Sequence, residues 1–245
     1  MLQSKRVEIQ PKTVRMRKIS DESAWRRNIS VDAPALHGSA DWNWQRNRGF
    51  QDDGGDDSGP LQRITSQVRF PQNRTIFNEG DEAAYTYRVN SGVVRLCKHT
   101  VQGRRIVLHF LFMGDYFGFR QPGAYSFTAE AVNDVTLTCY PQRQLESLAE
   151  RDNFVRERLR ALTMNRLLAV QDHLLMVGCL GAEERLAAFL AWLAERTGSD
   201  VPMRRQDIAD YLGLTVETVC RAFSKLRRNR SADAKRQGVA AQASQ

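Results

Sequence analysis

The sequence predicts an α+β fold, in which an antiparallel β-roll is followed by a helical C-terminal part. Short alternating apolar runs, separated by turn residues, recur from Val68 to Pro141. From about Arg143 the apolar residues recur at helical spacing instead, and a helix-turn-helix pattern covers Met203–Leu226. The length of 245 residues, 42% of them hydrophobic, is enough for a sizeable core.

Residues 1 to 60 differ in composition from the rest of the chain. They are rich in Arg, Asp, Asn, Ser and Gly, end in an Asp/Gly run, and show no sustained apolar period. Trp25, Trp42 and Trp44 stand alone in polar surroundings. We interpret this part as a disordered extension. The alternative is a segment that folds on contact with a partner, anchored by the tryptophans.

The strand signals have the near-regular spacing that is typical of a roll or barrel. Turn residues lie between them at 79–81, 90–92, 102–103 and 114–115. The predicted strands are Thr75–Phe77, Tyr85–Val89, Val93–Leu96, Ile106–Phe110 and Val135–Tyr140.

The helical part begins with a long helix, predicted at about 151 to 177. Its apolar stripe favours two interpretations equally: packing against the chain's own roll, or a coiled-coil-like dimer seam. Gly178–Gly181 interrupt the pattern, and a second helix is predicted at about 182 to 196. The predicted domains are an extension (1–60), a roll (61–150), a long helix (151–178), a helix-turn-helix domain (179–228) and a basic, disordered tail (229–245).

The helix-turn-helix pattern is the most informative feature of the sequence. Gln206–Leu212 forms a short first helix, and Gly213 can adopt the positive φ that the turn requires. Thr215 can cap the next helix through its hydroxyl. The buried stripe of that second helix is then formed by Val216, Val219, Phe223 and Leu226.

Burial of this stripe leaves polar side chains facing outward, as in a helix that reads DNA bases from its N-terminal half. Arg221 has the fork geometry for O6 and N7 of guanine, and Glu217 can accept a hydrogen bond from the N4 amine of cytosine. The alternative is that these two residues, one turn apart, form only a surface ion pair. The predicted DNA-binding residues are Arg204, Arg205, Gln206, Thr215, Glu217, Thr218, Cys220, Arg221 and Lys225.

Charge and composition agree with a nucleic-acid partner but do not prove one. The net charge is +8, and after Arg221 six further Lys and Arg residues face the single acid Asp233. Such a run is usually a solvated tail, but beside a recognition helix it favours phosphate contacts. No apolar run is long enough for a membrane span, and the polar start is unlike an export signal, so we expect a cytoplasmic protein.

The sequence carries no pattern typical of an enzyme or a metal centre. It has no Gly-rich phosphate loop, no His-x-x-x-His pair and no nucleophile elbow. The cysteines are Cys97, Cys139, Cys179 and Cys220, and no two have the close spacing of a zinc or iron–sulfur loop. We therefore predict neither catalysis nor a bound metal or cofactor. A roll that senses a small effector or haem, with DNA binding secondary, is the alternative function.

Asp207–Val219 together with Arg221 resembles the signature of the CRP/FNR family of bacterial regulators, its FixK-type branch most closely. Ile76–Asp81, Ser91-Gly92 and Gly114–Gly118 resemble the family's β-roll landmarks. The resemblance covers roughly residues 68 to 228. It implies a cyclic-nucleotide-binding-like β-roll, a long dimerisation helix and a winged helix-turn-helix, and it favours the dimer seam.

The resemblance also implies a function. Such regulators bind palindromes with TTGA-like half-sites as homodimers, contact RNA polymerase and mostly activate genes of low-oxygen respiration, denitrification or nitrogen fixation. We therefore expect a transcription activator that binds a TTGA-N6-TCAA-like site.

Four departures from the family pattern matter. No cysteine precedes Cys97, which argues against the iron–sulfur cluster of the FNR branch. Phe119 and Tyr125 stand where cyclic-nucleotide binders place a Glu and an Arg, which argues against cyclic AMP. Residues 231 to 245 have no strand pattern, so the wing is expected to be atypical or missing. Cys220 stands where FNR-type helices usually carry Ser. It is either a replacement with little effect or a candidate redox switch, because the negative charge of a sulfinate at this place would repel the DNA phosphates.

Overall fold

The computed structural model describes residues 61–119, 123–197 and 201–228. The predicted extension at 1–60, with its three tryptophans, lies outside the described residues. So do the predicted basic tail at 229–245 and the expected absence of a wing. Within the described residues no helix is long and apolar enough to cross a membrane.

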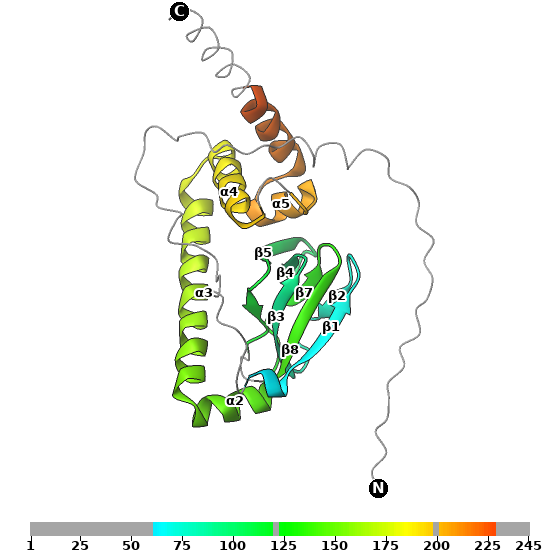
Figure 1. The fold of residues 1–245 in the computed structure, drawn as a ribbon. Helices are drawn as coiled ribbons and strands as arrows, with labels where there is room; N and C mark the ends of the chain where they lie inside the picture. The colour runs from blue at the N-terminus through cyan, green and yellow to red at the C-terminus, as the bar shows by residue number, and fades with distance from the viewer. Residues whose placement is uncertain (1–60, 120–122, 198–200, 229–245) are drawn as a thin grey trace, which may run out of the picture.

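Two antiparallel sheets of four strands form the roll that the sequence predicts (Figure 1). A short 3-10 helix, η2 (Gln62–Ile64), precedes the first strand. One sheet has the order β1-β8-β3-β6, with β1 Ser66–Phe70, β8 Val135–Pro141, β3 Tyr85–Ser91 and β6 Tyr116–Phe117. The other has the order β2-β7-β4-β5, with β2 Thr75–Phe77, β7 Thr128–Ala131, β4 Val94–His99 and β5 Arg105–Leu111.

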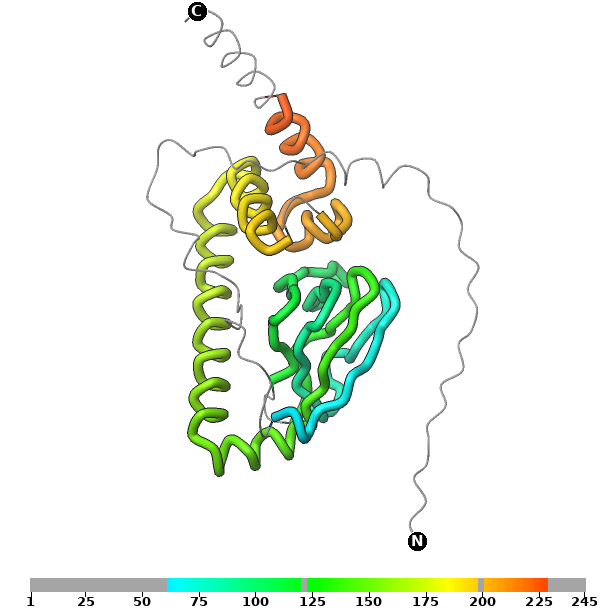
Figure 2. Tube along the Cα trace, in the orientation of Figure 1, coloured from blue at the N-terminus to red at the C-terminus, as the bar shows by residue number. Residues whose placement is uncertain are grey.

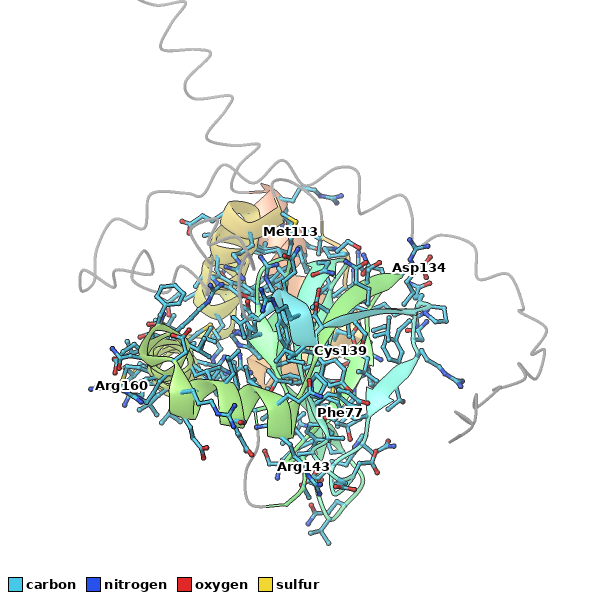
Figure 3. All side chains as sticks on the ribbon, turned by 60° about the horizontal axis from the view of Figure 1, so that its bottom comes forward. Phe77, Met113, Asp134, Cys139, Arg143 and Arg160 are labelled. Atoms are coloured by element: carbon cyan, nitrogen blue, oxygen red, sulfur yellow. The ribbon has the colours of Figure 1, made fainter. Side chains whose placement is uncertain are left out.

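The core of the roll lies between the two sheets. Alternate side chains of each strand point inward, so Val89, Leu96 and Leu137 are almost completely buried. Phe77 and Cys139 belong to the same cluster, and Figure 3 labels both within the roll. This packing gives the C-terminal helices a rigid support.

The helical part starts where the sequence predicts, at about Arg143, but its first ten residues form a separate helix before the long one. Helix α2 (Gln142–Arg151) leaves the roll directly after β8. Asp152 then adopts an extended conformation, and its carboxylate accepts hydrogen bonds from the amides of Phe154 (2.9 Å) and Val155 (3.3 Å). This cap starts helix α3 (Asn153–Cys179), which runs along one side of the roll (Figure 2).

Helix α3 has two apolar faces. On one, the buried side chains of Val155, Leu162, Ala169 and Met176 are spaced by seven residues and face the chain's own core. Away from this face, the large apolar side chains of Met164, Leu167 and Leu174 on the opposite side and of Leu168 and Leu175 at its margin are 44–69% exposed. The packing that the sequence predicts as one alternative is therefore present, and a second apolar face remains uncovered within the described chain.

The last three helices sit over the end of the roll where β4 and β5 lie (Figure 1). They are α4 (Ala182–Thr197), α5 (Arg205–Leu212) and a helix over residues 216–228. The first two occupy the positions that the sequence predicts to within one residue. Their side chains share one core with the roll: Phe110 of β5 packs 5.3 Å from Tyr211 of α5 and 6.0 Å from Phe189 of α4, between ring centroids.

Candidate nucleic-acid interface

The turn between α5 and helix 216–228 has the geometry that the sequence predicts. Helix α5 ends at Gly213, whose φ of 66° lies in the left-handed region, and the amide of Leu214 donates back to the carbonyl of Ala209 (3.0 Å). Glycine adopts this conformation without strain, which explains its place here. Thr215 then starts the next helix, because its hydroxyl accepts from the amide of Thr218 (3.2 Å).

The inner face of helix 216–228 fixes the helix against α4 and α5. Val219 is fully buried and Ala222 almost so, while Val216, Phe223 and Leu226 are partly buried against the same cluster. The predicted stripe is therefore the packed face. This attachment orients the opposite face toward solvent as a rigid surface.

The predicted base-reading residues lie on that solvent face. Glu217 and Arg221 are exposed, while Thr218 and Cys220 are half-buried at its margin. Among the described residues, Glu217 and Arg221 do not form the ion pair that was the alternative interpretation. The pKa of Glu217 is lowered by a hydrogen bond from its own backbone amide, then by the Thr215 hydroxyl and by the charge of Arg221. A carboxylate that stays ionised is the acceptor that a cytosine amine requires.

Cys220 lies closer to a cation than the sequence suggests. The Nη1 atom of Arg205, from the start of α5, donates to its sulfur at 3.3 Å. Arg205 is half-buried at this place, whereas Arg204 and Gln206 are exposed beside it. The structure therefore brings one of the predicted DNA-binding arginines against the cysteine rather than into open solvent.

Lys225 has a partner within the protein. Its Nζ atom lies 2.6 Å from Oε1 of Glu183 at the start of α4, and both side chains are about half exposed. An exposed pair of this kind contributes about 0–1 kcal/mol. Contact of Lys225 with DNA remains a prediction, and it would have to compete with this ion pair.

A buried charge cluster, which sequence reasoning missed, attaches α5 to the roll. Arg105 of β5 lies 2.6 Å from Oδ1 of Asp207 and 2.7 Å from Oδ2 of Asp210, between its Nη2 atom and each carboxylate. Arg95 of β4 lies 3.1 Å from Asp207 and 2.7 Å from Glu130. The available signal was that Asp207 and Asp210 are acids on a helix whose other inward residues are apolar.

A groove opens beside this cluster, between the β4–β5 hairpin and the turn of the helix-turn-helix. Its volume is about 530 Å³. It is lined by Arg104, Arg105, Gln206, Asp210, Leu214, Thr215, Val216 and Glu217. Three predicted DNA-binding residues, Gln206, Thr215 and Glu217, therefore share one concave surface with the roll.

Aromatic rings pack together around Tyr125 inside the roll. Tyr125 stacks on Phe77 with 3.6 Å between ring centroids, and its hydroxyl donates to the carbonyl of Tyr85 (2.7 Å). Gly118 also packs tightly against this cluster, because a Cβ atom there would lie 3.0 Å from the carbonyl of Tyr85 and 3.1 Å from the ring of Tyr87. Tyr125 therefore packs the roll where the resemblance expects an arginine for a phosphate. Among the described residues no group of acids, histidines or cysteines is arranged to hold a metal.

Comparison with protein families identifies both halves of the chain. Residues 67–152 match the cyclic nucleotide-binding domain, and residues 184–239 match the Crp-like helix-turn-helix domain. The two matches correspond to the roll with α2 and to the helical part from α4 onward.

Among characterised proteins, the chain is similar to regulators of nitrogen fixation. The nitrogen fixation regulation protein FixK of Bradyrhizobium diazoefficiens is 37% identical over 177 residues, which cover 69% of this chain and 75% of that protein. FixK of Rhizobium meliloti is 40% identical over 162 residues, covering 64% and 74%. The solved structure of FixK2 from Bradyrhizobium japonicum superposes with a TM-score of 0.65 at 36% identity, covering 68% of this chain and 86% of that one.

Proposed function

Since this chain belongs to the CRP/FNR family of transcription regulators and resembles its FixK-type branch, we propose that it binds a TTGA-N6-TCAA-like palindrome as a homodimer. The observation that carries this proposal is the face of helix 216–228, hereafter the recognition helix. It presents Glu217 and Arg221 to solvent from a capped, packed helix.

Base reading follows from the chemistry of these two side chains. Arg221 would donate two hydrogen bonds to O6 and N7 of the guanine in TTGA, and Glu217 would accept from the cytosine amine of a neighbouring base pair. Thr215, Thr218, Gln206 and Arg204 border this face and would bind sugar–phosphate oxygens, which set the position of the helix without reading sequence.

The palindrome requires two copies of the recognition helix. The exposed apolar face of α3 supports a parallel α3–α3 contact between two chains, as in a short coiled coil. A two-fold dimer places its recognition helices about one DNA turn apart, roughly 34 Å. The six base pairs between the half-sites fit that spacing.

The relatives suggest the biological setting. Proteins named for nitrogen fixation regulation and a transcriptional activator protein FnrL, 30% identical, are among them. We infer that this chain acts in the cytoplasm, where the DNA is, and activates low-oxygen or nitrogen-metabolism genes by contacting RNA polymerase. Cyclic AMP binding is not part of this proposal, because Tyr125 stacks on Phe77 where the resemblance expects an arginine for the phosphate.

Duplex binding tests the proposal directly. The wild-type protein should bind a TTGA-N6-TCAA duplex at least about 100-fold more tightly than a scrambled duplex, since specific and non-specific binding differ by roughly 10³ or more. Arg221→Ala should remove most of that preference. Ser224→Ala, a neighbouring exposed position on the same helix, is the matched control and should keep it. A wild-type protein that binds both duplexes equally would disprove the proposal.

A further inference from the structure

The β4–β5 hairpin of the roll has a fixed shape. The amide of Thr100 donates to the carbonyl of Arg104 (2.9 Å), and the amide of Gly103 donates to the carbonyl of Thr100 (2.8 Å). The Thr100 hydroxyl accepts from the amide of Arg104 (3.2 Å), and Gly103 has a φ of 77°. Both the amide and the carbonyl of Arg104 therefore form hydrogen bonds, which fix its backbone in the hairpin.

The hairpin also has a fixed position relative to the helix-turn-helix. Arg105, the next residue, binds Asp207 and Asp210 of α5 through its Nη2 and Nε atoms at 2.6–2.8 Å. The two aspartates are 2% and 8% exposed. Asp210 also accepts from Gln206 (2.7 Å), so its charge is satisfied within the protein. The backbone of Arg104 is thus fixed in position relative to α5 and to the start of the recognition helix.

Arg104 itself has no carboxylate partner among the described residues. Its side chain is exposed and lines the groove with Gln206, Thr215 and Glu217. If Glu217 reads a base edge, the adjacent DNA backbone has to pass the start of the recognition helix and the first turn of α5. That path runs along the groove. Of the two arginines that line the groove, Arg105 is paired with Asp207 and Asp210, whereas Arg104 is not.

We propose that Arg104 binds a phosphate of the target DNA, so that the roll contributes a contact to DNA binding. This inference rests on the proposed function. A guanidinium at this place offers two parallel donors to phosphate oxygens. The contact carries no sequence information, because it reaches the backbone and not the bases.

The test is the salt dependence of DNA binding by the full chain. Each phosphate contact that is lost lowers the slope of log K against log salt by about 1. Arg104→Ala should therefore lower the slope by about one per chain and weaken binding about fivefold at low salt, equally for the palindrome and for scrambled DNA. Arg104→Lys should restore most of the slope, because it keeps the charge.

Arg74→Ala is the matched control, since Arg74 is also an exposed arginine of the roll but does not line the groove. It should leave the slope unchanged. If Arg104→Ala has the affinity and slope of Arg74→Ala, the inference is wrong. Tighter binding by Arg104→Ala would also overturn it, because the hairpin would then obstruct the recognition helix. If the wild-type protein still prefers the palindrome, the proposed function stands in either case.

Discussion

The four cysteines differ sharply in their surroundings. Burial raises the pKa of Cys97 to about 12 and that of Cys139 to about 11, so both stay protonated and unreactive at neutral pH. Cys179 is exposed, and Cys220 is half-buried beside Arg205 and one residue before Arg221. Only Cys220 combines access with a place on the recognition helix.

We propose that Cys220 is a redox switch. Hydrogen peroxide would oxidise its sulfur through the sulfenate to the sulfinate and would itself be reduced to water. The added negative charge would lie next to Arg205 and Arg221 and would repel the DNA phosphates. Peroxide should therefore weaken palindrome binding by the wild-type protein.

Cys220→Ser should keep its affinity after the same treatment, and mass spectrometry should find two added oxygens at Cys220 of the wild type. Cys179→Ser is the matched control and should remain as sensitive as the wild type. An equal loss of binding in Cys220→Ser and in the wild type would refute the switch.

Residue roles on the recognition helix could be predicted because helical period and capping are local properties. Thr215, Gly213 and Val219 have the conformations that their neighbours in the sequence indicate. The partners of Arg205 and Lys225 could not be predicted in this way. Cys220 and Glu183 are 15 and 42 residues away from them in the chain. The packing of the recognition helix against α5 brings Cys220 to Arg205, and its packing against α4 brings Lys225 to Glu183.

At the scale of elements, strands with alternating β-branched residues were predicted and the others were not. β1, with the sequence Ser-Gln-Val-Arg-Phe, β6, with two residues, and β7, with Thr-Ala-Glu-Ala, carry too weak a pattern. They form because neighbouring strands pair with them: β7 lies between β2 and β4. Such pairing is a tertiary property that local propensity does not contain.

Helix α3 has an apolar outer face that no other part of the described chain covers. Leu167 and Leu174 are two turns apart on its outer face and are 50% and 69% exposed. We expect the double substitution Leu167→Glu and Leu174→Glu to separate the dimer, because four charges would be placed in one apolar seam. Analytical ultracentrifugation should show a wild-type mass of twice 27.9 kDa and a variant dissociation constant raised by roughly 100-fold or more.

Val101→Glu is the control for this experiment, since Val101 is a fully exposed apolar residue that lies away from α3, on the β4–β5 hairpin. It should remain dimeric. Circular dichroism should show the helix content of all three proteins to be alike. A monomeric wild-type protein, or a double variant that stays dimeric, would contradict the role given to α3.

At the scale of the whole molecule, the roll and the helix-turn-helix form one packed unit. Arg95 and Arg105 reach Asp207 across 112 and 102 residues of sequence, and the side chains of Asp115 and Arg196 form a second buried ion pair between the β5–β6 turn and α4. Removing one partner of such a buried pair leaves an uncompensated charge, which is costly. The roll therefore sets the orientation of the recognition helix, a property that no local sequence pattern indicates.

The account depends most on the contact between Arg221 and a guanine. Replacing the guanine of each TTGA half-site by 7-deazaguanine removes the N7 acceptor and leaves base pairing intact. We predict that this change weakens binding by the wild-type protein about tenfold or more, within the 1–3 kcal/mol of a bidentate contact. It should have no further effect on Arg221→Ala. Equal losses in the two proteins, or none in the wild type, would show that Arg221 does not read this base.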